Sequence, residues 1–119
     1  MTEHHDTVDF ADLPEVVSRY LRAHDVRDIP TAETALAPEA TVTDDGHTYE
    51  GQAAIRRWLE REGSQYTYTT TPLGAERHGP DEYTVVQRLE GDFPGGKVDL
   101  RFRFVLDADG RISRLVIAP

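Results

Sequence analysis

Hydrophobic residues near the start of the chain recur at helical spacing. Asp12 and Glu15 have the spacing of a capping box, and Pro14 is tolerated in a first turn, so we expect a helix to begin at Asp12. A second, short helix is predicted over residues 31–36, between two prolines. The stripe that indicates the first helix is typical of a helix that packs on a core. It consists of Leu13, Val16, Val17, Tyr20, Leu21 and His24.

From Ala40 onward the period of the pattern changes to two, as it does in strands. Asp45 and Gly46 lie between two such runs and predict a hairpin with a two-residue turn, because both turn positions need positive φ. After Gly51 the helical period returns, and a third helix is predicted over residues 52–62. Its apolar positions are Ala54, Ile55, Trp58 and Leu59.

The rest of the chain predicts four antiparallel strands, over residues 66–71, 82–89, 97–106 and 112–118. Helices that precede a meander of strands indicate an α+β fold, with about three helices on the concave side of a curved antiparallel β-sheet. We expect a single domain over residues 12–119 and treat residues 1–11 as a flexible leader. In the strand over residues 97–106 one face is apolar and consists of Val98, Leu100, Phe102, Phe104 and Leu106.

Composition narrows the functional classes. The net charge of −9, from 22 acidic and 13 basic residues, would repel a phosphate backbone, so nucleic acid is not an expected partner. No apolar run approaches the roughly 20 residues of a membrane span, so no membrane partner is expected either. The lack of cysteine fits a cytoplasmic location. The five histidines show no metal-binding spacing, and we predict neither a metal nor a cofactor.

The hairpin leaves two interpretations open. With its turn at this place, Asp44 and His47 lie opposite each other on one face, followed by Val42 and Tyr49. A carboxylate beside an imidazole in an apolar pocket can transfer protons. The alternative is that Asp44 only bonds to turn amides while His47 is solvated.

Three segments resemble the nuclear transport factor 2-like superfamily in their order and spacing. They are VVSRY at 16–20, PEATVTD at 38–44 and GQAAIRRW at 51–58. Within that superfamily the chain is most similar to ketosteroid isomerases and SnoaL-like polyketide cyclases. The resemblance implies a cone-shaped, cystatin-like α+β barrel, and it covers the chain from about Leu13 onward. Because this fold hosts isomerases, dehydratases, cyclases and non-catalytic binders, the function must be argued from the site.

The resemblance also implies roles for two residues. Tyr20 occupies the position of the phenol that donates a hydrogen bond to the enolate oxygen of the substrate, and Asp44 that of the carboxylate that moves the proton.

At two other positions the chain departs from the isomerases. Their second oxyanion donor, a protonated aspartic acid, corresponds to Phe102, and the nearby Asp99 lies on the opposite face of its strand. A supporting tyrosine corresponds to Leu59. His47 is a candidate to compensate, as a donor or as a second acid/base group.

These residues predict a small cofactor-independent enzyme of SnoaL or ketosteroid-isomerase type, an isomerase, cyclase or dehydratase. Its acid/base chemistry would act on a hydrophobic carbonyl or polyketide-like molecule, with Asp44, Tyr20 and His47 as catalytic residues. The alternative is a non-catalytic small-molecule-binding or dimerisation module of the same fold. The resemblance implies a homodimer through the outer sheet face, which carries Arg101 and Arg103. The expected substrate-binding walls are Val42, Tyr49, Trp58, Leu59, Leu100, Phe102 and Phe104.

Overall fold

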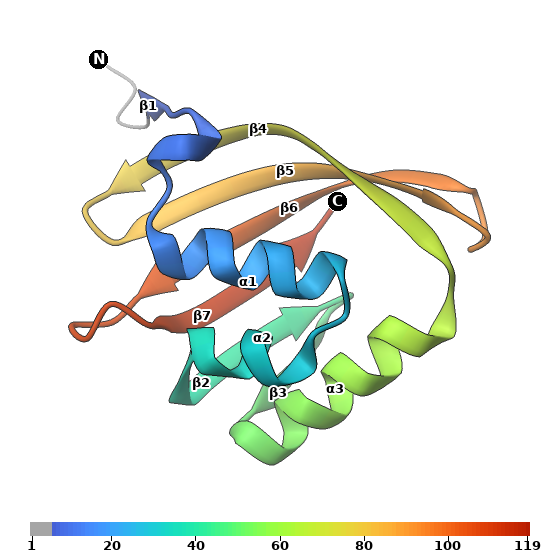
Figure 1. Cartoon of the computed structure of the whole chain (residues 1–119), viewed down its shortest axis with the longest axis horizontal. Helices are drawn as coiled ribbons and strands as arrows, with labels where there is room; N and C mark the ends of the chain where they lie inside the picture. Colours follow the sequence, from blue (N-terminus) through green and yellow to red (C-terminus); the bar gives the residue numbers. More distant parts are fainter. Residues whose placement is uncertain (1–5) are drawn as a thin grey trace.

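The computed structural model describes residues 6–119, with side chains for residues 7–61 and 66–119 (Figure 1). The helices are α1 (Glu15–Asp25), α2 (Ile29–Ala35) and α3 (Gln52–Gln65), and a 3₁₀ turn covers Phe10–Asp12. The strands are β1 (Asp6–Thr7), β2 (Leu36–Asp44), β3 (His47–Glu50), β4 (Tyr68–Gly79), β5 (Glu82–Gly91), β6 (Lys97–Leu106) and β7 (Ile112–Ala118). All strands belong to one sheet, in the order β1-β4-β5-β6-β7-β2-β3.

The predicted α+β fold with three helices is confirmed, but the sheet is mixed and open rather than antiparallel and closed. β2 runs parallel to β7, with Val42 opposite Leu115, while the other pairs are antiparallel. Periodicity along one strand cannot reveal this pairing, because β2 and β7 are separated by most of the chain. Because β1 and β3 end the strand order, the sheet does not close into a barrel.

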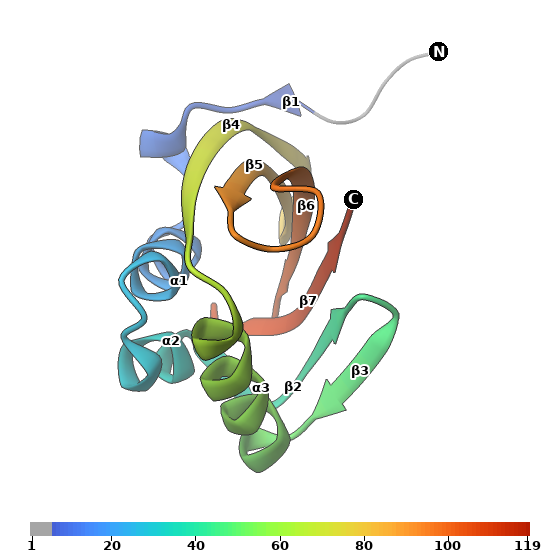
Figure 2. The ribbon, with the colours of Figure 1, turned by 90° about the vertical axis from the view of Figure 1, so that its right-hand side faces the viewer.

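The sheet curves around an interior that the helices cover. Figure 2 shows β4, β5 and β6 wrapping over one side of this interior, while the three helices line the other. Shifts of register assist the curvature, since an extra residue bends and twists a strand. Two of these shifts lie in β4, between Pro72 and Gly74 and between Arg77 and Gly79.

The predicted start of the first helix is wrong. α1 begins at Glu15 because Leu13 and Pro14 are extended, with ψ of 148° and 145°, and no side chain caps the helix. The second helix begins at Ile29, earlier than predicted, because Asp28 is its N-cap and accepts a hydrogen bond from the Thr31 amide at 3.3 Å.

The alternation predicted for β6 is confirmed. Phe102 and Phe104 are buried, whereas Arg101 and Arg103 are exposed on the opposite face. Full burial of a phenylalanine contributes about 1.5–3 kcal/mol, so these positions determine which face of the strand turns inward. They belong to a continuous hydrophobic core that includes Val17 and Leu115.

Part of the predicted leader lies along the sheet. Thr7 is paired with Glu76 of β4, and the Val8 amide donates to the Ala75 carbonyl at 3.0 Å. His4 and His5 fall outside the described residues.

Candidate functional site

The hairpin that carries Asp44 forms as predicted. Asp44 and His47 are Cα partners, and Val42 is paired with Tyr49. Asp45 and Gly46 have φ of 53° and 79°, the two positive values that a tight, right-twisted hairpin turn requires. This turn fixes which face Asp44 shares with the buried Val42.

Asp44 is hydrogen-bonded to Trp58, a residue that is predicted only as a wall of the site. The indole Nε1–H of Trp58, in α3, donates a hydrogen bond to Oδ2 of Asp44 at 3.0 Å. Trp58 is 2% exposed and Asp44 is half-buried. A donated hydrogen bond of this kind fixes one oxygen of the carboxylate, so Trp58 holds Asp44 in a defined orientation against α3.

The indole is itself held in place. The Tyr49 ring lies 6.1 Å from the Trp58 ring at an interplanar angle of 30°. The Tyr49 hydroxyl accepts a hydrogen bond from Arg61 at 2.8 Å, and the Arg61 guanidinium also lies over the Tyr49 ring. These polar and aromatic contacts join the hairpin to α3 beside Trp58.

His47 is not brought into this interior. Its backbone lies opposite Asp44, but its side chain is exposed. β3 is an edge strand and this pair is the last before the turn, so the hairpin tip leaves the imidazole in solvent. A pattern of alternating residues predicts the face of a strand but not how far the core extends along it.

Tyr20 lies in the core on α1, fully buried. Its ring stacks on His24 at 5.8 Å and meets the edge of Phe104 at 5.8 Å. His24 in turn meets Phe102 at 6.2 Å. His24 lies on the predicted apolar stripe near the end of α1, where a favourable interaction with the helix dipole was the role expected of it; its spacing of four residues from Tyr20 is the signal that predicts the ring contact.

Register places Asp44 and Phe102 in one row across the sheet. Asp44 is paired with Ile117, Ile117 with Phe102, and Phe102 with Val85. At about 4.8 Å per strand, Asp44 and Phe102 are roughly 10 Å apart along this row. Phe102 is therefore an inward-facing residue of this row, 2% exposed.

The remaining predicted walls lie in or against the same core. Val42, Trp58, Leu59, Phe102 and Phe104 are buried, and Tyr49 and Leu100 are partly buried. Asp99 lies on the outer face, where it accepts two hydrogen bonds from Arg88, at 2.8 and 3.1 Å. The hydrogen bond from Arg88 lowers the pKa of Asp99 and raises that of Arg88.

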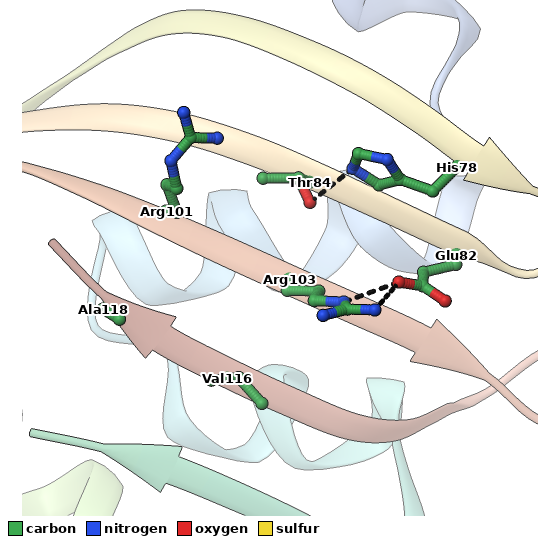
Figure 3. Close-up of a pocket in the computed structure, with 7 residues that line it drawn as sticks. All are labelled: His78, Glu82, Thr84, Arg101, Arg103, Val116 and Ala118. Carbon is green, nitrogen blue, oxygen red and sulfur yellow. Dashed lines mark hydrogen bonds and ion pairs between the residues drawn. The ribbon is translucent and has the colours of Figure 1, made fainter. Parts of the chain in front are cut away.

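The outer face of the sheet carries a separate open trough of about 580 Å³ (Figure 3). Within it Arg103 Nε donates to Glu82 at 2.5 Å, and His78 Nε2 and Thr84 Oγ1 are 2.8 Å apart. A second hollow of about 470 Å³ adjoins it through Glu82, Arg103 and Val116. These polar groups face away from Tyr20 and the core.

The described part of the chain has neither a cluster of metal ligands nor a membrane-spanning helix. No group of three or more histidine and acidic side chains there could hold a metal ion. None of the described helices has the length and apolar character needed to cross a membrane.

Residues 17–115 match the model of the SnoaL-like domain family. The chain belongs to this family. The crystal structure of a "putative polyketide cyclase" from Sinorhizobium meliloti is 33% identical, with a TM-score of 0.85, and the match covers 93% of this chain and all of the other. The predicted family is therefore confirmed. Among curated proteins none matches the chain.

More distant structures share the fold. The epoxide hydrolase/cyclase-like enzyme SalBIII, which acts in pyran ring formation in the polyether salinomycin, is 20% identical with a TM-score of 0.74 over 87% of this chain and 86% of its own. A Mycobacterium tuberculosis protein in complex with estradiol-17β-hemisuccinate is 17% identical with a TM-score of 0.73, over 87% and 90% of the two chains.

Proposed function

We propose that this SnoaL-like protein is a small enzyme that needs no cofactor and performs acid/base chemistry on a hydrophobic carbonyl or polyketide-like molecule. The observation that carries the proposal is the Trp58–Asp44 hydrogen bond, which orients a half-buried carboxylate at the edge of an apolar core. The names of the similar cyclases support the substrate class.

In this proposal Asp44 removes a proton from the carbon next to a carbonyl, and the electron pair of the C–H bond moves onto the carbonyl oxygen. The Tyr20 hydroxyl donates a hydrogen bond to that oxygen, and protonated Asp44 returns the proton at another position. His47, exposed and opposite Asp44 in the hairpin, would exchange protons between the carboxylate and water.

Deuterium exchange tests the proton abstraction without knowledge of the natural substrate. The protein is incubated with 2-tetralone in D₂O, and loss of the α-proton signals is followed by NMR. We expect Asp44→Asn to lower the protein-dependent exchange at least 100-fold. Exchange at the wild-type rate in Asp44→Asn would exclude Asp44 as the base. Saturable binding of the ketone without exchange would favour the non-catalytic binding module.

The predicted homodimer and cytoplasmic location stay predictions. For the dimer we propose the outer sheet face, where the exposed Arg101 points away from the Arg103–Glu82 pair (Figure 3). Acids of a second copy could pair with it, which suits a chain of net charge −9. Light scattering should give a dimer mass that Arg101→Glu lowers and Arg22→Glu, on the exposed side of α1, leaves unchanged. A monomeric wild type would refute the dimer.

A further inference from the structure

The outer face of the sheet carries three arginines from β5 and β6, and one of them differs from the other two. Arg88 donates two hydrogen bonds to Asp99, at 2.8 and 3.1 Å. Arg103 donates to Glu82 at 2.5 Å. Arg101 lies between Asp99 and Arg103 on this face of β6 and is exposed. Among the residues whose side chains the structure describes, Arg101 forms no ion pair.

The register of the sheet explains why Arg101 has no counter-ion there. Its Cα partners are Val86 on β5 and Ala118 on β7, which are both uncharged. The nearest acid on its own face of β6 is Asp99, and both oxygens of that carboxylate are bound to Arg88. Because pairing across a sheet needs opposite charges at adjacent positions, the neighbouring strands do not neutralise Arg101.

Arg101 borders the open trough of about 580 Å³ on the outer face, a volume within the range of small-molecule sites, about 300–1,000 Å³. Val116 and Ala118 form an apolar strip of its lining on β7, whereas Thr84 and His78 contribute polar groups from β5 and β4. Figure 3 shows the Arg101 guanidinium on the side of Thr84 and His78. The trough therefore has a cation at its polar side and an apolar strip at the other.

The trough is also a region of positive charge on an acidic protein. The adjoining hollow of about 470 Å³ adds Arg114 to the arginines that line this face. Glu82 is the single acid among the described residues that line the two hollows, and it is bound to Arg103. Since the whole chain has a net charge of −9, this local excess of arginine attracts anions where most of the surface repels them.

We propose that this trough binds a small organic carboxylate with an apolar body, and that Arg101 holds its carboxylate group. A guanidinium donates two parallel hydrogen bonds to a carboxylate, which gives geometric specificity as well as charge attraction. The apolar body of the ligand covers Val116 and Ala118 on β7. The site does not depend on the reaction proposed for Asp44, because the trough faces away from the core.

An acidic side chain of a second copy offers the same carboxylate chemistry, and it would exclude the ligand from Arg101. A single glutamate side chain fills only a small part of a trough of about 580 Å³, whereas a molecule with a ring-sized body fills much more of it. The free ligand is therefore the occupant that the shape of the trough favours, and the experiment must separate it from a second copy.

A matched pair of probes tests the site. 2-Naphthoate and 2-naphthamide have nearly the same shape, and only the first is charged. Each is titrated into the full chain and followed by heteronuclear NMR, which gives the dissociation constant and locates the probe through its effect on backbone amide signals. Arg101→Gln removes the cation, and Arg22→Gln, on the exposed side of α1, makes the same change in net charge as a control. Light scattering of the same samples gives the oligomeric state.

We expect 2-naphthoate to shift the amide signals of Arg101, Val116 and Ala118. Arg101→Gln should raise its dissociation constant roughly tenfold, the lower end for a hydrogen bond to a charged group, because the trough is open to water. Arg22→Gln should leave this constant unchanged, and 2-naphthamide should bind wild type and Arg101→Gln equally. Added salt should weaken the binding of 2-naphthoate to the wild type, since it screens exposed charges.

Three outcomes overturn the inference. Shifts confined to Trp58 and the helices would place the probe in the interior, which refutes the outer site and leaves the proposed function standing. Equal wild-type affinity for the two probes, or a naphthoate affinity that Arg101→Gln retains, would show that the guanidinium does not bind the carboxylate. If 2-naphthoate does not bind and Arg101→Gln converts a dimer into a monomer, the occupant of the trough is a second copy.

Discussion

The contact between Trp58 and Asp44 can be measured as a coupling energy. The perturbation is a double-mutant cycle of Trp58→Phe and Asp44→Ala, which removes the indole donor, the carboxylate acceptor, or both. The hydrogen bond is 3.0 Å long and its acceptor is charged, for which about 1.5–3 kcal/mol is typical. Because Asp44 is half-buried and water can replace part of the bond, we expect a value near the lower end, about 1.5 kcal/mol.

The single mutant Trp58→Phe should lose more stability than the hydrogen bond alone contributes. Trp58 is 2% exposed, so the smaller phenyl ring also leaves a cavity that costs about 1–2 kcal/mol. Trp58→Phe should therefore lower the free energy of unfolding by about 3 kcal/mol in all, which a domain stable by about 5–15 kcal/mol survives. The cycle cancels the cavity term, because that term is present whether or not residue 44 is an aspartate.

Urea unfolding followed by far-UV circular dichroism is the suitable assay, since Trp58 is the one tryptophan of the chain and its fluorescence is lost in the mutant. Equal m-values across the four proteins would establish that the mutations change stability rather than the unfolded state. A coupling energy below about 0.5 kcal/mol would refute the argument that Trp58 orients Asp44, because an oriented charge-assisted bond cannot be that weak.

Two further predictions concern the hairpin turn and the outer face. Gly46→Ala should destabilise the protein by about 1 kcal/mol in thermal unfolding, because φ of Gly46 is +79°, although a Cβ there would meet no atom within 4 Å. Gly74→Ala is the control and should be neutral, because Gly74 has the same free space and no positive φ. Equal effects of the two mutations would contradict the argument from backbone strain. The lowered pKa of Asp99 gives stability that is present above its unfolded pKa of about 3.9 and is lost as pH falls through the lower folded value. Arg88→Leu should therefore weaken the fall of stability below about pH 4, and an unchanged acid slope would show that the pair does not form in solution.

The elements that the sequence predicts well are those governed by neighbouring residues. The Asp45-Gly46 turn and the alternation around Phe102 depend on backbone preference and on a period of two, and both are confirmed. The parallel pairing of β2 with β7 depends on contacts between distant parts of the chain, to which no local pattern refers. The start of α1 was missed because Leu13 and Pro14 extend the chain just after the predicted cap.

Features of the candidate site likewise divide into those that the sequence predicts and those that depend on contacts between distant parts of the chain. The family resemblance and the alternation along the strand predict Tyr20 and Asp44 as site residues. The hydrogen bond from Trp58 to Asp44 joins a helix to a strand, so residue spacing could not predict it. The exposure of His47 follows from its place at the end of an edge strand, where alternation continues beyond the core.

The phenylalanine at position 102 limits the reactions that the proposed site could catalyse. Loss of one oxyanion donor typically costs about 3–4 kcal/mol in the transition state, and a buried phenyl ring offers no donor. If Tyr20 alone receives the developing charge, the substrate must stabilise much of that charge itself. A carbon between two carbonyl groups does so, because its anion is shared by both oxygens, whereas an isolated ketone does not. In the proposed reaction, substrates that spread this charge themselves, such as 1,3-dicarbonyl compounds or the benzylic position of 2-tetralone, would therefore react faster than simple aliphatic ketones.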